Sequence, residues 1–139
     1  MQVHYQRITI IKTGRSPTNT INDELQWFGG SLGLFSLRDK DKSCFRIFIT
    51  LLQYAKQQQA ITSDELAAQL GLTRGTVVHH LNKLMESGIV VHRANHYALR
   101  TTNLTELVEE IERDAKRMVA DLKKVAGTID KALNLPKSE

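Results

Sequence analysis

The stretch ITSDELAAQLGLTRGTVVHHLNKLMESGIV, residues 61–90, decides the fold. Thr62 is followed three residues later by Glu65, the spacing of a capping box that starts a helix. Leucines and alanines then recur at helical spacing as far as Leu70. Gly71 follows directly and suits the left-handed residue that ends such a helix. The sequence therefore predicts a short capped helix and a sharp turn over residues 62–71.

A second helix is predicted over residues 74–87, with Thr73 as its cap. Gly88 ends it, because glycine readily adopts the conformation found after a helix. One face of this helix is apolar and anchors it to a scaffold; the residues of that stripe are Val77, Leu81 and Leu84. The opposite face stays free to contact another molecule.

Two short strands are predicted after this pair of helices, over residues 89–92 and 97–100, with a turn at residues 93–96. A longer helix is predicted before the pair, over residues 39–59, capped by Asp39 or Asp41. The order helix, helix, turn, helix, strand, strand is that of a winged helix-turn-helix. The predicted class is mainly α with a small β wing.

The motif DELAAQLGLTRGTVVHHLNKLMESGIV resembles the ArsR-like winged helix-turn-helix family of transcriptional regulators. The shared features are a leucine-and-alanine helix, a Gly-Leu-Thr turn, a Thr-Val-x-x-His-Leu helix and a closing Gly-Ile-Val. The resemblance implies a dimeric DNA-binding regulator, and most members are prokaryotic repressors. It does not extend to the N-terminal 38 residues. Metal-sensing members carry cysteine pairs, whereas Cys44 is the only cysteine here, so we expect no thiolate metal site.

Residues on the free face of the second helix and on the wing are the candidates for DNA contact. Arg74 suits a guanine edge or a phosphate, Val78 a thymine methyl, and Asn82 an adenine. Gly75 permits close approach of the backbone. The full set predicted to contact DNA is Arg74, Gly75, Thr76, Val78, His79, Asn82, Lys83, Arg93 and His96.

A last, long helix is predicted from Asn103, whose cap is supported by Glu106, to a stop at Pro136. Apolar residues recur along it at alternating spacings of four and three, which is a coiled-coil seam. The predicted dimerisation residues are Leu104, Val108, Ile111, Ala115, Met118, Leu122, Val125 and Ile129, and the pattern continues to Ala132. The alternative is that this helix covers its own domain. A helix over residues 104–132 spans about 43 Å, too long for one small core to cover, which favours a homodimer.

The N-terminal region is predicted to hold a strand over residues 3–11, a loop over 13–20 and a short helix over 21–28. Glycines then break an unusually apolar stretch, FGGSLGLF at residues 28–35. We interpret it as an arm that packs onto the domain or onto a partner. The expected organisation is an arm over residues 1–38, the winged domain over 39–100 and the terminal helix over 101–139.

Composition narrows the function further. The chain has 139 residues and a formal net charge of +4. Residues 1–61 hold eight Lys and Arg against four Asp and Glu, while residues 62–100 hold four against three. A basic DNA-facing patch must therefore be made by folding or by dimerisation. The sequence shows no catalytic motif, so we expect a protein that is not an enzyme and needs no cofactor.

The two adjacent histidines of the second helix are not predicted to form a metal site. His79 and His80 are adjacent, about 100° apart on a helix, so they cannot bind one metal ion from the same face; His80 is predicted to be structural.

Without an apolar span or a signal peptide, we expect a cytoplasmic protein. The leading hypothesis is a sequence-specific regulator of transcription that binds double-stranded DNA as a homodimer. The alternative is a winged-helix adaptor that binds protein or structured RNA. The operator and any effector stay open.

Overall fold

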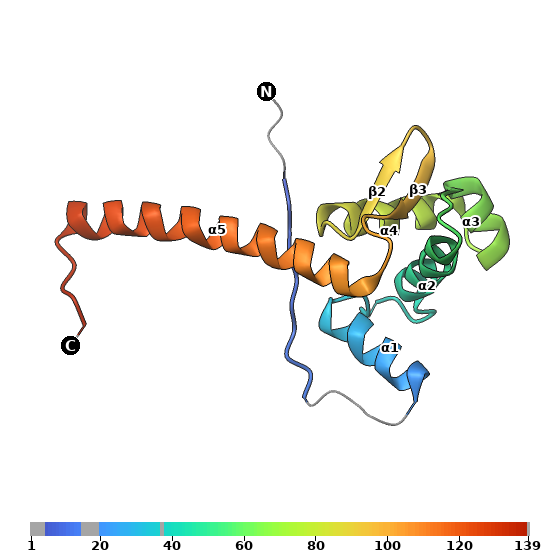
Figure 1. Ribbon diagram of the computed structural model, residues 1–139, viewed down its shortest axis with the longest axis horizontal. Helices are drawn as coiled ribbons and strands as arrows, with labels where there is room; N and C mark the ends of the chain where they lie inside the picture. Colours follow the sequence, from blue (N-terminus) through green and yellow to red (C-terminus); the bar gives the residue numbers. More distant parts are fainter. Residues whose placement is uncertain (1–4, 15–19, 37, 139) are drawn as a thin grey trace.

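The computed structural model describes residues 5–14, 20–36 and 38–138 (Figure 1). A small winged domain occupies one end, and a single long helix projects from it (Figure 1). Within these residues, five helices and a three-stranded antiparallel sheet of order β1-β3-β2 confirm the predicted winged helix-turn-helix. The elements are α1 (Ile21–Ser31), α2 (Ser43–Lys56), β1 (Ile61–Thr62), α3 (Ser63–Leu70), α4 (Arg74–Glu86), β2 (Val90–Arg93), β3 (His96–Leu99) and α5 (Leu104–Leu133).

The core forms where the apolar faces of α2, α3 and α4 meet the sheet. Phe48 is its largest fully buried side chain, and it stacks on Phe28 of α1 with ring centroids 6.3 Å apart. Burying an aliphatic or aromatic side chain of this size is worth about 1.5–3 kcal/mol, so the stripe on each helix decides which face turns inward. The other fully buried side chains are Ile47, Leu51, Ile61, Leu66, Val77, Leu81, Leu84, Ile89 and Leu107.

The turn between α3 and α4 is built as the sequence predicts. The Thr62 hydroxyl accepts a hydrogen bond from the Glu65 amide at 3.1 Å, and the Glu65 carboxylate accepts one from the Thr62 amide at 3.4 Å. Gly71 has φ +66°, a left-handed conformation that glycine adopts without strain. Arg46 of α2 donates from Nη2 to the carbonyl oxygen of Leu70 at 2.7 Å. This bond fixes the end of α3, and with it the entry into α4.

The wing contains one strand that the sequence did not predict. Strands β2 and β3 each lie one residue from their expected positions, and Arg93 pairs with His96 at the tip. The additional strand, β1, pairs Ile61 with Tyr97 and Thr62 with His96. A two-residue strand has too few residues to show alternation, so its pairing partner, not its own pattern, defines it.

The strand expected at the N-terminus is not found in the described residues 5–11, and residues 3 and 4 lie outside the described ranges. The chain is extended there, but its amides bond to helix ends. Arg7 donates to the Glu86 carbonyl at 2.8 Å and Ile11 to the Ser31 carbonyl at 2.7 Å. Its β-rich composition favours extended backbone, but a strand also needs a neighbouring strand to pair with.

Helix α1 continues through Gly29 and Gly30 to Ser31, beyond the end predicted at residue 28, whereas Gly33 lies outside it. A Cβ on Gly29 would lie 2.7 Å from Cδ1 of Phe45, so the absent side chain is what lets α1 approach α2. Leu34, just beyond the helix, is 4% exposed and belongs to the core. The apolar stretch at residues 28–35 therefore packs onto its own domain.

Helix α2 begins four residues later than predicted, at Ser43. Asp39 still acts as the capping side chain, because its carboxylate accepts hydrogen bonds from the amides of Ser43 at 2.9 Å and Cys44 at 3.0 Å. The helix ends at Lys56, so the glutamines at residues 57–59 lie outside it.

Helix α5 begins as predicted and ends earlier. Asn103 caps it by accepting from the Glu106 amide at 2.8 Å. Its last residue is Leu133, and Asn134 takes up a left-handed conformation with φ 54°, so Pro136 is not what stops it. Asparagine tolerates that conformation better than most residues and commonly ends helices.

The apolar seam of α5 divides into two parts. Leu107, which the heptad spacing omits, is fully buried in the protomer's own core, and Ile111 is 4% exposed. Beyond Ala115 the helix leaves the domain, and Leu122 is 69% and Val125 57% exposed (Figure 1). The first part therefore covers its own domain, as in the alternative stated above, and Ile111, which was predicted as a dimerisation residue, is buried within its own protomer.

We predict that Leu107→Ala lowers the free energy of unfolding by about 2–5 kcal/mol, because the cavity forms in a close-packed core. Urea denaturation followed by circular dichroism measures it. Thr105→Ala, an exposed neighbour on the same helix, is the control and should change stability by less than about 0.5 kcal/mol. Equal midpoints for the two variants would contradict the placement of Leu107.

Candidate nucleic-acid interface

Helix α4 has one buried face and one exposed face. At about 100° per residue, the buried residues Val77, Leu81 and Leu84 leave Gly75, His79 and Asn82 at the middle of the opposite side. Among the predicted contacts, the exposed ones are Arg74, Gly75, His79, Asn82, Lys83, Arg93 and His96, while Thr76 and Val78 are half-buried. The structure thus gathers five of the predicted residues on the exposed side of α4 and places two on the wing.

Two of the predicted residues have less freedom than their spacing suggests. The Thr76 amide and hydroxyl are both engaged by the hydroxyl of Thr73, at 3.2 and 2.9 Å, as part of the helix cap. Val78 is half-buried and lies toward the edge of the exposed face. Helical spacing alone does not reveal either limit, because both come from packing and capping around α4.

Arg74 forms an ion pair with Asp64 of α3, with Nε and Oδ1 3.5 Å apart. Both side chains are more than 70% exposed, and exposed pairs of this kind contribute little to stability. The guanidinium of Arg74 can therefore exchange this partner for a base edge or a phosphate at low cost.

The loop before α2 brings charged side chains of both signs beside α4, which motif analysis missed. Arg38 and Lys40 lie beside Lys83 of α4, around a hollow of about 620 Å³. The full lining is Ser36, Arg38, Asp39, Lys40, Asp41, Ser43, Thr76, His79, His80 and Lys83. The excess of Lys and Arg before residue 62 was the one signal for this arrangement. Folding brings Arg38 and Lys40 to the edge of α4, together with Asp39 and Asp41.

His80 faces the interior of this region. It is 8% exposed, and its Nε2 lies 3.9 Å from Oδ2 of Asp39. Burial lowers the pKa of His80, although the nearby Asp39 carboxylate opposes this shift. His80 is therefore neutral at pH 7, and the exposed His79 is the member of the pair that faces solvent.

Cys44 and the remaining potential metal ligands give no metal site in the described part of the chain. Burial raises the pKa of the Cys44 thiol to about 11, so it stays protonated and unreactive at neutral pH. Within residues 5–14, 20–36 and 38–138, no three His, Cys, Asp or Glu side chains gather closely enough to hold an ion.

A half-buried ion pair, between Arg100 and the buried Asp114, ties the end of α4 to α5 and to the N-terminal segment. Arg100 donates from Nη1 to Oδ2 of Asp114 at 2.6 Å, and Gln6 donates to the same oxygen at 2.8 Å. Arg100 also reaches the carbonyl of Gly88, just after α4, at 3.4 Å. The hydrogen bond from Arg100 is the main reason that the pKa of Asp114 is lowered. This cluster fixes where α4 and the wing lie relative to α5.

The fold and the exposed face of α4 define the chain as a winged helix-turn-helix protein, the architecture of many DNA-binding transcription regulators. Residues 55–91, from the end of α2 into β2, match the family described as "Bacterial regulatory protein, arsR family". The match confirms the resemblance found in the sequence, and the chain carries a helix-turn-helix of the ArsR type. No curated protein matches the chain. In the part of the chain that the structure describes, no helix is both long and apolar enough to cross a membrane.

We predict that Asp114→Asn lowers the free energy of unfolding by about 1.5–3 kcal/mol at pH 7, because it removes a charged hydrogen-bond partner. A carboxylate whose folded pKa is lowered stabilises the fold above its unfolded pKa, and this contribution is lost as pH falls through the folded value. The difference between the wild type and the variant should therefore shrink as pH falls below the ordinary value of 3.8.

Urea midpoints at pH 7 and near pH 3 measure this change, with the exposed Asp121→Asn as the control. A gap between wild type and Asp114→Asn that is independent of pH would contradict the role of the charge.

Proposed function

We propose that this protein is a sequence-specific regulator of transcription that binds double-stranded DNA as a homodimer. The observation that carries the proposal is the exposed face of α4, which is polar, is anchored from behind by a buried stripe, and has Arg38 and Lys40 of the preceding loop at its edge. The ArsR-type match over residues 55–91 supports the same function.

In this proposal α4 enters the major groove with its first turns toward the bases. Arg74 recognises guanine or holds a phosphate, and Asn82 recognises adenine. Lys83, with Arg38 and Lys40 of the neighbouring loop, contacts the phosphate backbone. The wing residues Arg93 and His96 lie against the backbone or the minor groove of the flanking DNA.

The homodimer rests on the exposed part of α5. Beyond Ala115, the apolar side chains of α5 are largely exposed to solvent in the protomer. Those exposed by more than a third are Met118, Val119, Leu122, Val125, Ile129 and Leu133. An amphipathic helix with such a stripe is typical of a helix that packs against a partner. Two protomers would engage two half-sites at once, which raises the affinity of each for DNA.

The adaptor hypothesis is supported by the low charge of residues 62–100, where four cations face three anions. The loop before α2 adds Arg38 and Lys40 beside α4, but it also adds Asp39 and Asp41, so its net charge does not decide between the two functions. The two functions differ in one measurable property, since a DNA-binding surface releases counterions and its affinity falls steeply with salt. Selection from a random duplex pool should return a site with twofold symmetry if the homodimer binds specifically.

We predict that Arg74→Ala and Asn82→Ala each weaken binding to a selected duplex by about 1–3 kcal/mol, because each removes a base contact. Fluorescence anisotropy at fixed salt measures the affinity. Lys56→Ala at the end of α2 removes an equal charge outside α4 and is the control for Arg74→Ala. Unchanged affinity in both α4 variants would refute the assignment of the reading face.

We predict that Leu122→Asp converts a dimer of twice 15.7 kDa into a monomer and sharply lowers DNA affinity. Burying the aspartate carboxylate in the apolar seam of a dimer is strongly unfavourable. In the monomer position 122 is exposed to solvent, where the carboxylate stays hydrated. Lys124→Asp, an exposed change on the same turn, should leave the dimer intact. Sedimentation equilibrium decides the matter, and a wild-type mass of 15.7 kDa at micromolar concentration would rule out the homodimer.

A further inference from the structure

His80 is a polar side chain on the buried stripe of α4, next to Leu81. An apolar side chain would pack at this position without the cost of burying an imidazole. Nε2 of His80 lies 3.9 Å from Oδ2 of Asp39, which is beyond hydrogen-bond distance, and no group in the described ranges of the chain bonds to Nδ1. Neither apolar packing nor a hydrogen bond therefore accounts for a histidine here.

Asp39, the nearest charged partner of His80, is held firmly at the start of α2. Its side chain is 11% exposed, and its carboxylate accepts hydrogen bonds from the amides of Ser43 and Cys44. Burial would raise the pKa of Asp39, but these two bonds outweigh it and the pKa is lowered, so the carboxylate is charged at neutral pH. An ionised carboxylate only accepts, so it favours the tautomer of His80 with its proton on Nε2 and leaves Nδ1 as the basic nitrogen.

Both residues lie in the wall of the hollow of about 620 Å³ at the edge of α4. While its two histidines are neutral, the hollow has a net charge of +1, because the cations Arg38, Lys40 and Lys83 face the carboxylates Asp39 and Asp41. One proton on His80 would raise this net charge to +2 and cancel the charge of Asp39. The protonated hollow is therefore the better match for a phosphate backbone.

We propose that DNA binding is coupled to the uptake of one proton by Nδ1 of His80, and that the resulting imidazolium neutralises Asp39 so that the cations of the hollow hold the phosphate backbone. The proton comes from solvent, and the N–H at Nε2 becomes a charge-assisted donor toward Asp39. This coupling rests on the DNA-binding function proposed above and adds a proton to it. His80 acts through Asp39 and contacts no base.

The surroundings of His80 keep it neutral in the free protein. Burial lowers its pKa, the Asp39 carboxylate opposes this shift, and His79 and Lys83 add to it. Phosphates that approach these two residues bring negative charge and so favour the proton. The remaining charged or titratable side chains on the loop, the first turns of α2, α3, α4 and the segment that bonds to the end of α4 are Arg38, Lys40, Asp41, Lys42, Cys44, Arg46, Asp64, Glu65, Arg74, Glu86 and Arg7. The two α3 carboxylates are occupied by their capping box and by an ion pair with α4.

Linkage fixes the direction of the pH dependence. Because the pKa of His80 is lowered in the folded protein, acid below its ordinary value of 6.5 protonates the unfolded chain first and lowers the stability of the free protein. The same proton stabilises the complex, so the affinity for duplex DNA rises as pH falls, by at most about tenfold per pH unit for one proton. A merely structural histidine would not combine falling stability with rising affinity.

Fluorescence anisotropy of the full-length chain with a duplex selected from a random pool tests the coupling, at fixed salt between pH 7.5 and 5.5. We expect the wild type to bind about tenfold more tightly at the lower pH. His80→Gln should lose most of this gain, and any gain that remains belongs to the exposed His79 and His96. His92→Gln, which removes an exposed histidine outside the proposed DNA contacts, is the control and should keep the full gain.

Asp39→Asn tests the coupling from the other side. Asparagine still caps α2, so the loop keeps its place while the charge is removed. We expect this variant to bind duplex more tightly than the wild type at pH 7.5 and to gain less from acid.

Proton NMR gives a measurement that needs no substitution at the buried position. The chain has five histidines, and single changes to glutamine at the other four positions assign the imidazole resonance of His80 by elimination. We expect this resonance to titrate below pH 6.5 in the free protein and at a higher pH in the complex with duplex.

The remaining outcomes separate the coupling from the function on which it rests. Affinity for duplex that does not depend on salt at either pH would refute DNA binding, and the coupling with it. Salt-dependent binding in which the wild type and His80→Gln gain equally from acid would overturn the coupling alone, and so would a His80 resonance whose midpoint does not move when duplex is added. Weaker binding of Asp39→Asn at pH 7.5 would show that Asp39 supports the loop rather than opposes DNA, and would also overturn it.

Discussion

Burial of the apolar stripe on α4 is the interaction on which the rest of this structure depends. Val77, Leu81 and Leu84 are essentially inaccessible to solvent, and their contact with α2 and α3 fixes the rotation of α4 about its axis. Interiors are close-packed, so that rotation cannot drift without opening cavities. The exposed face, with His79 and Asn82 at its middle, is the geometric complement of this buried stripe. Recognition by α4 is therefore a consequence of how its other face packs.

Signals that act within a few residues allowed the centre of the fold to be predicted. The capping box at Thr62 and Glu65, the turn at Gly71 and the cap at Asn103 each involve neighbours in sequence, and each appears where it was expected. The N-terminal region was predicted wrongly because its structure depends on contacts with residues that are distant in sequence. Whether residues 5–11 form a strand depends on a partner, and the groups that accept their hydrogen bonds include Glu86 and Ser31, which are distant in sequence. Gly29 likewise reads as a helix breaker until Phe45 is seen against it.

The candidate interface was predictable in outline and not in detail. Periodicity identified the exposed side of α4, and the predicted cap at Thr73 implies its bond to the Thr76 amide. Neither signal could show that the two hydroxyls also bond to each other, or that the loop at Arg38 and Lys40 lies alongside. The same limit applies to α5. A heptad pattern indicates which residues prefer burial, but it does not indicate which chain buries them. The burial of Leu107 in the core of its own protomer therefore could not be predicted from the seam.

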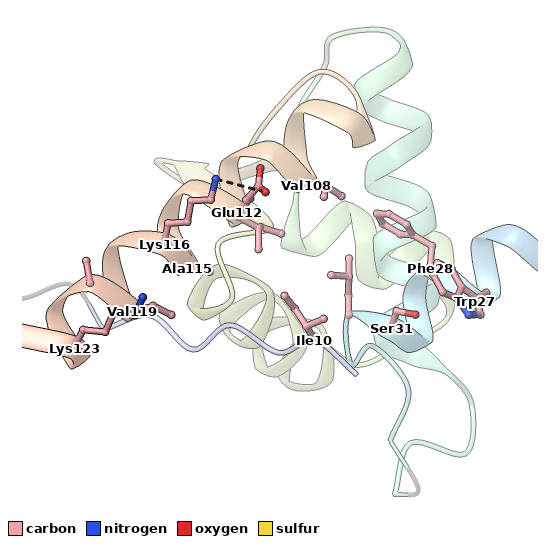
Figure 2. Close-up of a pocket in the computed structure, with 13 residues that line it drawn as sticks. Ile10, Trp27, Phe28, Ser31, Val108, Glu112, Ala115, Lys116, Val119 and Lys123 are labelled. Atoms are coloured by element: carbon pink, nitrogen blue, oxygen red, sulfur yellow. Dashed lines mark ion pairs between the residues drawn. The ribbon is translucent and has the colours of Figure 1, made fainter. Parts of the chain in front are cut away.

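The two ends of the molecule are connected through α5. Asp114 points toward Arg100 and the end of α4. Its neighbour Ala115, on another side of the same turn, lines the apolar groove between α5, α1 and the N-terminal segment (Figure 2). A rotation or shift of α5 must therefore carry Arg100 with it or break the half-buried ion pair, which would leave the buried Asp114 without its charged partner. Gln6 bonds to the same carboxylate, and its segment continues to Ile10 in the wall of the groove. The N-terminal segment, α5 and the base of the wing are therefore joined through Asp114.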